Sequence, residues 1–150
     1  MPKRFAIEKI LVALDGSDHS KRALDMAIFL AKKLKAKITA ISIIDNSSMA
    51  TISENVATYP LYEALQSSAQ RFLDEAQKTG EEKKVEIETK LCIGPPANEI
   101  LKLSVEFDLV VVGTMGKTGL SYFLLGSVAD KVVRRCKVPV LVVPLKGDDC

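Results

Sequence analysis

Hydrophobic positions along the chain alternate between short apolar runs and longer stretches with helical periodicity. Runs rich in β-branched residues predict strands at 9–14, 37–44, 85–92, 108–113 and 138–143. Amphipathic stretches that lie between these runs predict helices. Strict alternation of strand and helix indicates an α/β fold, in which right-handed crossovers join a parallel sheet covered by helices on both faces.

Each predicted helix carries a recognisable start, end or apolar face. The first follows Asp15-Gly16-Ser17, with Ser17 as a candidate N-cap. Its apolar face comprises Ala23, Leu24, Ala27, Ile28, Ala31 and Leu34. The second helix ends near Gly80, and its apolar face comprises Leu61, Leu65, Ala69, Phe72 and Ala76. The third begins after Pro95-Pro96 and buries Ile100, Leu101, Ser104 and Phe107. The fourth runs over 127–136.

The polarity of the strands predicts their order in the sheet. Runs 9–14 and 108–113 are almost continuously apolar, which is typical of central strands, whereas 85–92 alternates charged and apolar residues like an edge. The order 3-2-1-4-5 of an open five-stranded Rossmann-like sheet satisfies this pattern. Its topological switch point lies between the first and fourth strands, where Asp15 and Gly113 follow the apolar runs, and ligands of such sheets bind there.

Composition restricts the classes of protein that fit. A chain of 150 residues with 47% apolar content is expected to form one domain over 1–150. Its 21 basic and 19 acidic residues are interspersed, so nucleic acid is not an expected partner. Three cysteines without a Cys-x-x-Cys pair indicate neither a disulfide framework nor a thiolate metal site. With no apolar run of membrane-spanning length, we expect a cytoplasmic protein that does not enter the membrane.

Glycines follow the fourth predicted strand at a spacing that favours phosphate binding. Gly113 and Gly116 come directly after the apolar run, and the pair Gly126-Ser127 precedes the fourth helix. Glycines let main-chain amides approach an anion, and the start of a helix supplies amides without partners. The alternative is that these glycines merely permit tight turns. Their place at the predicted switch point favours a nucleotide.

Polar residues near this point have two interpretations each. Asp15 is a candidate ligand for ribose, adenine groups or a hydrated metal, or else an Asx turn that caps the first helix. Ser127 is a candidate phosphate donor or a helix cap. Lys117 could offset phosphate charge but is more simply a solvated loop lysine, and His19, the only histidine, could be a catalytic base but is expected to be exposed. No catalytic residue and no protein metal site is predicted.

The last predicted strand is apolar along its whole length. It begins at Val138 and ends at Val143, and an uncovered edge of this kind favours pairing with another strand. We therefore expect a homodimer formed along 138–143, the alternative being that the tail after Pro144 covers the edge. The apolar loop 120–125 could cover a ligand, pack on the sheet or contact another subunit.

Three segments together resemble the universal stress protein family, in its ATP-binding branch. They are residues 10–17, the second strand ending at Ile43-Ile44-Asp45, and the glycine motif that runs from Val111 to Val128, while 46–58 match little. The resemblance implies an adenine nucleotide alpha hydrolase-like fold and a dimer formed through the last strand. It also implies an ATP site, with Mg²⁺ as a candidate companion, composed of Ala13, Leu14, Asp15, Ile43, Val112, Gly113, Gly116, Gly126, Ser127 and Val128. Met115 departs from the histidine often found between the first two glycines of the family.

The function predicted from these observations is a dimeric, ATP-binding stress or regulatory protein. Because no general base is evident near the phosphates, hydrolysis is expected to be slow or absent. Three alternatives stay open. Gly116-Lys117-Thr118 resembles the end of a P-loop, although Val111 stands where its first glycine belongs. Residues 14–19 loosely resemble the loop of ATP-pyrophosphatase-like enzymes, and the third alternative is an interaction module that binds no nucleotide.

Overall fold

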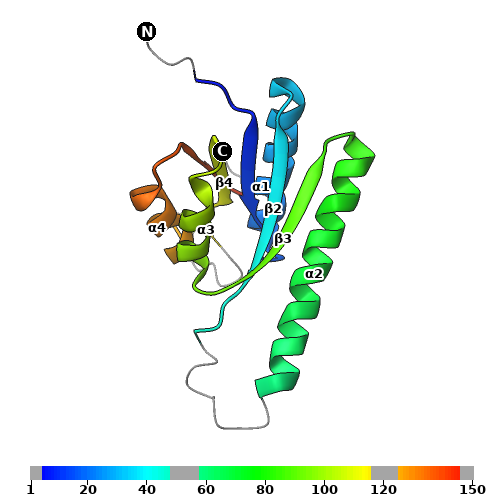
Figure 1. Cartoon of the computed structure of the whole chain (residues 1–150), viewed down its shortest axis with the longest axis vertical. Helices are drawn as coiled ribbons and strands as arrows, with labels where there is room; N and C mark the ends of the chain where they lie inside the picture. Colours follow the sequence, from blue (N-terminus) through cyan, green and yellow to red (C-terminus); the bar gives the residue numbers. More distant parts are fainter. Residues whose placement is uncertain (1–4, 48–57, 116–124, 146–150) are drawn as a thin grey trace.

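The computed structural model describes residues 5–47, 58–115 and 125–145, which form a parallel sheet with helices on both faces (Figure 1). Its strands are β1 (Lys9–Ala13), β2 (Lys37–Ile44), β3 (Ile87–Ile93), β4 (Leu109–Gly113) and β5 (Val140–Val143). Its helices are α1 (Asp18–Leu34), α2 (Thr58–Lys83), α3 (Pro96–Ser104) and α4 (Ser127–Arg135). The strand order is β3-β2-β1-β4-β5, so the predicted order 3-2-1-4-5 is confirmed.

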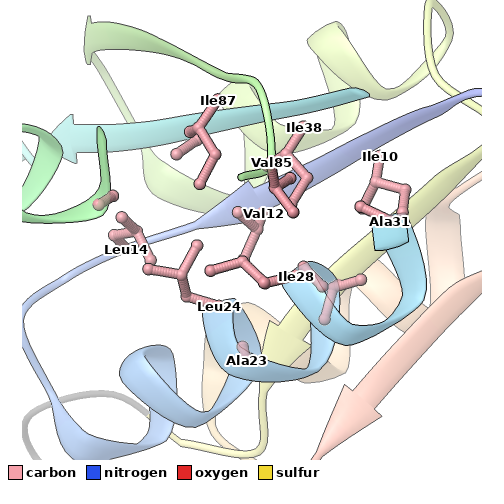
Figure 2. Close-up of a cluster of buried hydrophobic side chains, with 14 of the residues drawn as sticks. Ile10, Val12, Leu14, Ala23, Leu24, Ile28, Ala31, Ile38, Val85 and Ile87 are labelled. Carbon is pink, nitrogen blue, oxygen red and sulfur yellow. The ribbon is translucent and has the colours of Figure 1, made fainter. Parts of the chain in front are cut away.

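Successive residues of the central strands point to opposite faces of the sheet and form two apolar clusters. Ile10 and Val12 of β1 belong to the cluster under α1 and α2, and Figure 2 shows the Val12 side chain near Ile28 and the Ile10 side chain near Ala31 of α1. Leu11 and Val110 belong to the cluster under α3 and α4. Because both faces are covered, β4 is apolar at every position and β1 at every position after Lys9, which agrees with the almost continuously apolar runs in their sequences.

The register of the central strands defines the edge where a ligand is expected. Ile10 pairs with Leu109 and Val12 pairs with Val111, so β1 and β4 run side by side and end together. Since β2 lies beyond β1 and β5 lies beyond β4, the crossovers leave β1 and β4 in opposite directions. This is the switch point of the fold.

Helix α1 begins and ends as its sequence directs. Ser17 is the N-cap, and its hydroxyl oxygen accepts a hydrogen bond from the Ser20 amide at 3.1 Å. The helix stops at Lys35, which adopts a left-handed conformation with φ of 56°. The predicted apolar face is buried except for Leu34, which is 45% exposed. At this end the turn at Lys35 brings Ala36 into the core instead.

Helix α2 is longer than predicted and does not stop at Gly80. It continues to Lys83, and the left-handed turn is made by Lys84 with φ of 60°. Gly80 is buried, and a Cβ atom there would lie 2.8 Å from the carbonyl oxygen of Val85. This glycine therefore lets the strand segment approach the helix, a role that sequence reasoning mistook for a stop signal.

The remaining boundaries and faces differ from prediction by small amounts. Strand β3 begins at Ile87 and β5 at Val140, each two residues later than expected, and α4 ends at Arg135. In α2 the inward residues include Leu73, 1% exposed, whereas the predicted Leu61 is 42% exposed.

Candidate functional site

The turn from β1 to α1 is organised by Asp15. Its Oδ1 accepts a hydrogen bond from the Ser17 amide at 2.9 Å and another from the Ser17 hydroxyl. The Asp15 amide in turn donates to the Ser20 hydroxyl at 3.3 Å. Asp15 thus forms the Asx turn that was one of its two predicted roles. Within the described part of the chain no hydrogen bond engages its second oxygen, Oδ2.

A side chain from α2 lies against this turn. Gly16 has φ of 81°, and a Cβ atom there would overlap the ring of Phe72. The Arg71 guanidinium lies over the same ring, 5.7 Å from its centroid. Glycine is therefore needed at position 16 both for the left-handed backbone and for the contact with Phe72.

The end of β4 lies against the first turn of α1. A Cβ atom at Gly113 would lie 2.8 Å from the backbone carbonyl of His19 and equally close to its Cβ. Packing of strand on helix is thus sufficient to explain a glycine here, without any ligand. This packing role differs from the tight turn that was the predicted alternative, because Gly113 does not have a positive φ. Contact of Gly113 with a ligand stays a prediction.

His19 and Thr114 connect α1 to the residue that follows β4. His19 Nδ1 and Thr114 Oγ1 are 2.9 Å apart and hydrogen-bonded, across 95 residues of sequence. His19 is half-buried, so the expectation that it is exposed was wrong. The physical reason is that β4 ends directly beside the first turn of α1. Thr114 was missed, although a threonine next to the glycine that ends a central strand was a usable signal.

Helix α4 begins at the same edge of the sheet. The Gly126 amide donates to the Thr114 carbonyl at 2.7 Å, and Gly126 occupies the N-cap position. The first intrahelical bond runs from the Asp130 amide to the Gly126 carbonyl at 2.9 Å. The amides of residues 127–129 therefore precede the first hydrogen bond of the helix, and amides of this kind are available to an anion.

Ser127 does not cap α4. It is the first helical residue, and the cap position belongs to Gly126, which has φ of −62°, ψ of 162° and no side-chain cap bond. The capping role predicted for Ser127 is wrong because the extended conformation of Gly126 places the boundary one residue earlier. Its alternative role, as a donor to phosphate, stays a prediction.

The other predicted site residues divide between the two faces of the sheet. Ala13 and Ile43 are half-buried and pack on the α3/α4 side. Leu14 lies on the opposite side, 6% exposed in the α1/α2 core, where Figure 2 shows its side chain. Val112 is also buried, at 4% exposed. Gly116 and Lys117 lie outside the described residues.

Amide hydrogen bonds narrow the place where an anion can bind. The Leu14 amide donates to Ile41 at 2.8 Å, and the Thr114 amide donates to Val143 at 3.2 Å. The amides of Asp15, Ser17 and Gly126 also donate to groups within the protein. Few main-chain amides in the turns after β1 and β4 are therefore left to bind an anion. Among the amides described at this edge, those of the first turn of α4 are the best placed for phosphate.

Among the described residues, titratable groups away from this edge of the sheet do not form a second candidate site. In the segments that the structure describes, no three His, Cys, Asp or Glu side chains gather as metal ligands. Cys92 and Cys136 are free thiols, and burial raises the pKa of the Cys92 thiol. A surface hollow of about 390 Å³ lies between the ends of α3 and α4, where Leu101 and Arg135 are among its lining residues. It is away from the carboxyl ends of β1 and β4.

Comparison with known proteins identifies the family. The family model described as the universal stress protein family matches residues 6–144. The chain belongs to the universal stress protein family. It is 40% identical over 138 residues to universal stress protein MJ0531 of Methanocaldococcus jannaschii, an alignment that covers 91% of this chain and 81% of the relative. It is 35% identical over 144 residues to universal stress protein YxiE of Bacillus subtilis, with 90% and 97% covered.

Solved structures have the same fold. The hypothetical protein MJ0577 superposes with a TM-score of 0.82 at 26% identity, over 95% of this chain and 99% of that one. A universal stress protein solved in complex with cAMP superposes with a TM-score of 0.66 at 30% identity, over 94% and 99%. Some structural neighbours of this universal stress protein thus bind an adenine nucleotide. In the part of the chain described, no helix is long and apolar enough to cross a bilayer.

Proposed function

We propose that this universal stress protein is a dimeric, cytoplasmic ATP-binding regulator that hydrolyses ATP slowly or not at all. The observation that carries the proposal is the meeting, at one edge of the sheet, of the Asp15 turn and the open first turn of α4. A relative of the same family that binds cAMP supports an adenine nucleotide as the ligand.

The triphosphate would contact α4. The amides of Ser127 and Val128 precede the first intrahelical hydrogen bond, and the positive end of the helix dipole attracts anions. Ser127 is an exposed residue at the same turn. Gly126 and Gly116 would keep the approach to these amides free of side chains.

The nucleoside would lie over the ends of β1 and β2. Ala13 and Ile43 are half-buried on the α3/α4 side, where their exposed surface can line a base. Leu14 and Val112 would contribute through their main chains, since their side chains are buried in the core. Asp15 Oδ2 and the backbone of Gly113 would contact ribose.

Mg²⁺ is proposed as the companion of ATP. This ion is commonly held by one or two carboxylates together with substrate phosphates, and it keeps several waters. Asp15 Oδ2 is a carboxylate oxygen at the proposed site that the Asx turn does not use. Contact of Oδ2 with this ion is the alternative to its contact with ribose. In that case the protein would supply one ligand, directly or through water, and the nucleotide would supply the others.

Slow turnover is proposed from the described residues that lie near the proposed phosphates. Hydrolysis needs a group that orients or deprotonates water. His19, the one histidine of the chain, is already hydrogen-bonded to Thr114, and Asp15 Oδ1 is engaged in its turn. Catalysis would depend on backbone electrostatics, which position the phosphates but do not activate a nucleophile.

The dimer is proposed to form along β5. This strand lies at an edge of the sheet, and three of its four residues, Val140, Leu141 and Val142, are only half-buried. An apolar edge strand with unpaired main-chain groups is a template for another strand. In the dimer, the β5 strands of two copies would form main-chain hydrogen bonds with each other.

Mass spectrometry of released ligand tests the nucleotide proposal. Freshly purified protein is denatured and the supernatant is analysed, first for the wild type and then for Gly126→Leu. Because Gly126 has ordinary φ and ψ values, leucine there blocks the approach to α4 without demanding an unusual backbone. Gln77→Leu, on the exposed face of α2, is the matched control.

We expect adenine nucleotide from the wild type and from Gln77→Leu, and little from Gly126→Leu. Wild-type protein that releases none, and that binds none when ATP is added, would support the interaction module instead. Rapid ATP hydrolysis by clean protein would contradict the regulatory assignment.

A further inference from the structure

Helices α1 and α4 lie on opposite faces of the sheet, yet both begin at the same edge. The buried side chains of α1 belong to the cluster on one face, and those of α4 to the cluster on the other. Figure 1 shows the two helices separated by the strands. The sheet therefore prevents direct packing of one helix against the other, and contact between their first turns must run through the chain at the strand ends.

Thr114 provides that contact. Its amide donates to Val143 of β5, its carbonyl accepts from Gly126 at the start of α4, and its hydroxyl bonds to His19 in the first turn of α1. Three elements thus meet at one residue. Because the branched side chain of threonine is stiff at χ1, a bond to its hydroxyl also restrains its main chain.

The carbonyl of Thr114 is the acceptor for the N-cap amide of α4, at 2.7 Å. Displacement of this carbonyl would move the helix start and the amides of its first turn. Phosphate binding depends on where those amides point, and small displacements of positioned groups weaken such contacts strongly.

We infer that His19 is a positioning residue of the nucleotide site, which acts through Thr114 to set where the first-turn amides of α4 meet phosphate. This inference rests on the proposed function. It assigns to the chain's one histidine a role without proton transfer and without contact to the ligand. His19 would affect the binding of the phosphates and leave the binding of the nucleoside unchanged.

Comparison of ATP with adenosine isolates this role. Both ligands are titrated by calorimetry into wild type, Thr114→Val, Thr114→Ser, His19→Ala and His19→Asn, with Mg²⁺ present. Valine matches the shape of threonine without the hydroxyl, serine keeps the hydroxyl, and asparagine places an amide near the Nδ1 position. Thr79→Val is the matched control, because it removes a hydroxyl bonded to Glu75 within α2, away from the site.

Loss of the bond should weaken ATP binding about 5-fold in Thr114→Val and in His19→Ala, which corresponds to one hydrogen bond. The affinity of each variant for adenosine should stay within about 2-fold of the wild-type value, a change smaller than the loss of one hydrogen bond would produce. Thr114→Ser and His19→Asn should recover most of the ATP affinity. The double variant His19→Ala/Thr114→Val should bind ATP no more weakly than either single variant, since both remove the same interaction.

Two different failures can be told apart. Wild type that binds neither ligand overturns the proposed function and this inference with it. Wild type that binds ATP while both His19→Ala and Thr114→Val bind it equally well overturns the inference alone. Equal weakening of ATP and adenosine, in step with a lower free energy of unfolding, also overturns it, because a merely structural role would produce that result.

Discussion

Asp15 serves the turn with one oxygen, which leaves the other for a ligand. Asparagine at this position keeps the Oδ1 acceptor for the Ser17 amide, whereas alanine removes it. Asp15→Asn should therefore change the free energy of unfolding by less than about 0.5 kcal/mol, while Asp15→Ala costs about 1 kcal/mol. If the carboxylate binds ribose or Mg²⁺, both variants should lose ATP affinity. Urea unfolding and calorimetry on the two variants check this, and full ATP affinity in Asp15→Asn would exclude the carboxylate from the site.

Gly113 and Gly126 are glycines for different reasons, which a pair of alanine substitutions can separate. A Cβ atom at Gly113 would lie 2.8 Å from the backbone of His19, so Gly113→Ala should destabilise the fold by about 1–3 kcal/mol. Gly126 has φ of −62° and ψ of 162°, a conformation open to any residue. Gly126→Ala should therefore change stability much less. Equal losses in urea unfolding of the two variants would refute the packing explanation of Gly113.

Cys92 is expected to be the less reactive of the two described thiols. Burial raises its pKa, so the reactive thiolate is scarcer at neutral pH, and the side chain is also buried in the α3 face of the sheet. Because the folded pKa is raised, the stability contribution of the protonated thiol is present at neutral pH and is lost as the pH rises past about 9. Alkylation followed by peptide mapping should modify Cys136 before Cys92. Faster labelling of Cys92 would contradict its burial.

The contacts of single residues were harder to predict from the sequence than the elements or the fold. Ser17 and the Asx turn at Asp15 were predictable, because capping and turn signals involve neighbours in sequence. The bond between His19 and Thr114 was not predictable, because it joins residues 95 apart that meet only when β4 pairs with β1. For the same reason, the sequence did not reveal that Gly113 packs against His19.

Helix α2 shows at the level of elements how a local rule can be overridden by tertiary contact. Glycine near the end of an amphipathic stretch normally indicates a stop, yet α2 passes through Gly80 because β3 packs against it. Alanine in place of a helical glycine usually stabilises by about 0.5–1 kcal/mol. Here Gly80→Ala should instead destabilise by about 1–3 kcal/mol, since its Cβ would lie 2.8 Å from the Val85 carbonyl oxygen.

Urea unfolding of Gly80→Ala, compared with Gln77→Ala one turn earlier on the exposed face, measures the difference. A gain in stability for Gly80→Ala would mean that the approach of β3 is looser than these contacts indicate.

Strand positions and order were predictable because burial determines both. Central strands β1 and β4 are covered on both faces and are apolar apart from Lys9 at the start of β1. Strand β3 alternates because its outer residues, such as Glu88 and Lys90, are exposed to solvent. Boundaries shifted by up to two residues, as at β3 and β5, because pairing and not polarity decides where a strand begins. The strand order determined the switch point between β1 and β4. The switch point in turn placed the turn after β1 and the start of α4 at the same edge of the sheet.

At the scale of the whole molecule, the position of β5 at the edge of the sheet determines the expected assembly. Pro139 and Val143 direct their carbonyls to β4, so by alternation the main-chain groups of Val142 point away from β4. Val142→Pro would remove the outward donor while the pairing with β4 is kept, because proline is tolerated on an edge strand. Val142→Thr, which keeps the amide, is the control. Sedimentation at micromolar concentration should give dimers for wild type and Val142→Thr and monomers for Val142→Pro, whereas a monomeric wild type would refute the dimer.

The central claim is that a nucleotide binds with its phosphates on the first turn of α4. The most direct measurement is a titration with ATP and Mg²⁺ that follows backbone amide resonances by NMR. We predict saturable shifts of the Ser127, Val128 and Ala129 amides, with unchanged signals at the far end of α2, and much smaller α4 shifts when adenosine replaces ATP. Binding of ATP that leaves these three amides unmoved, or no binding at all, would contradict the account.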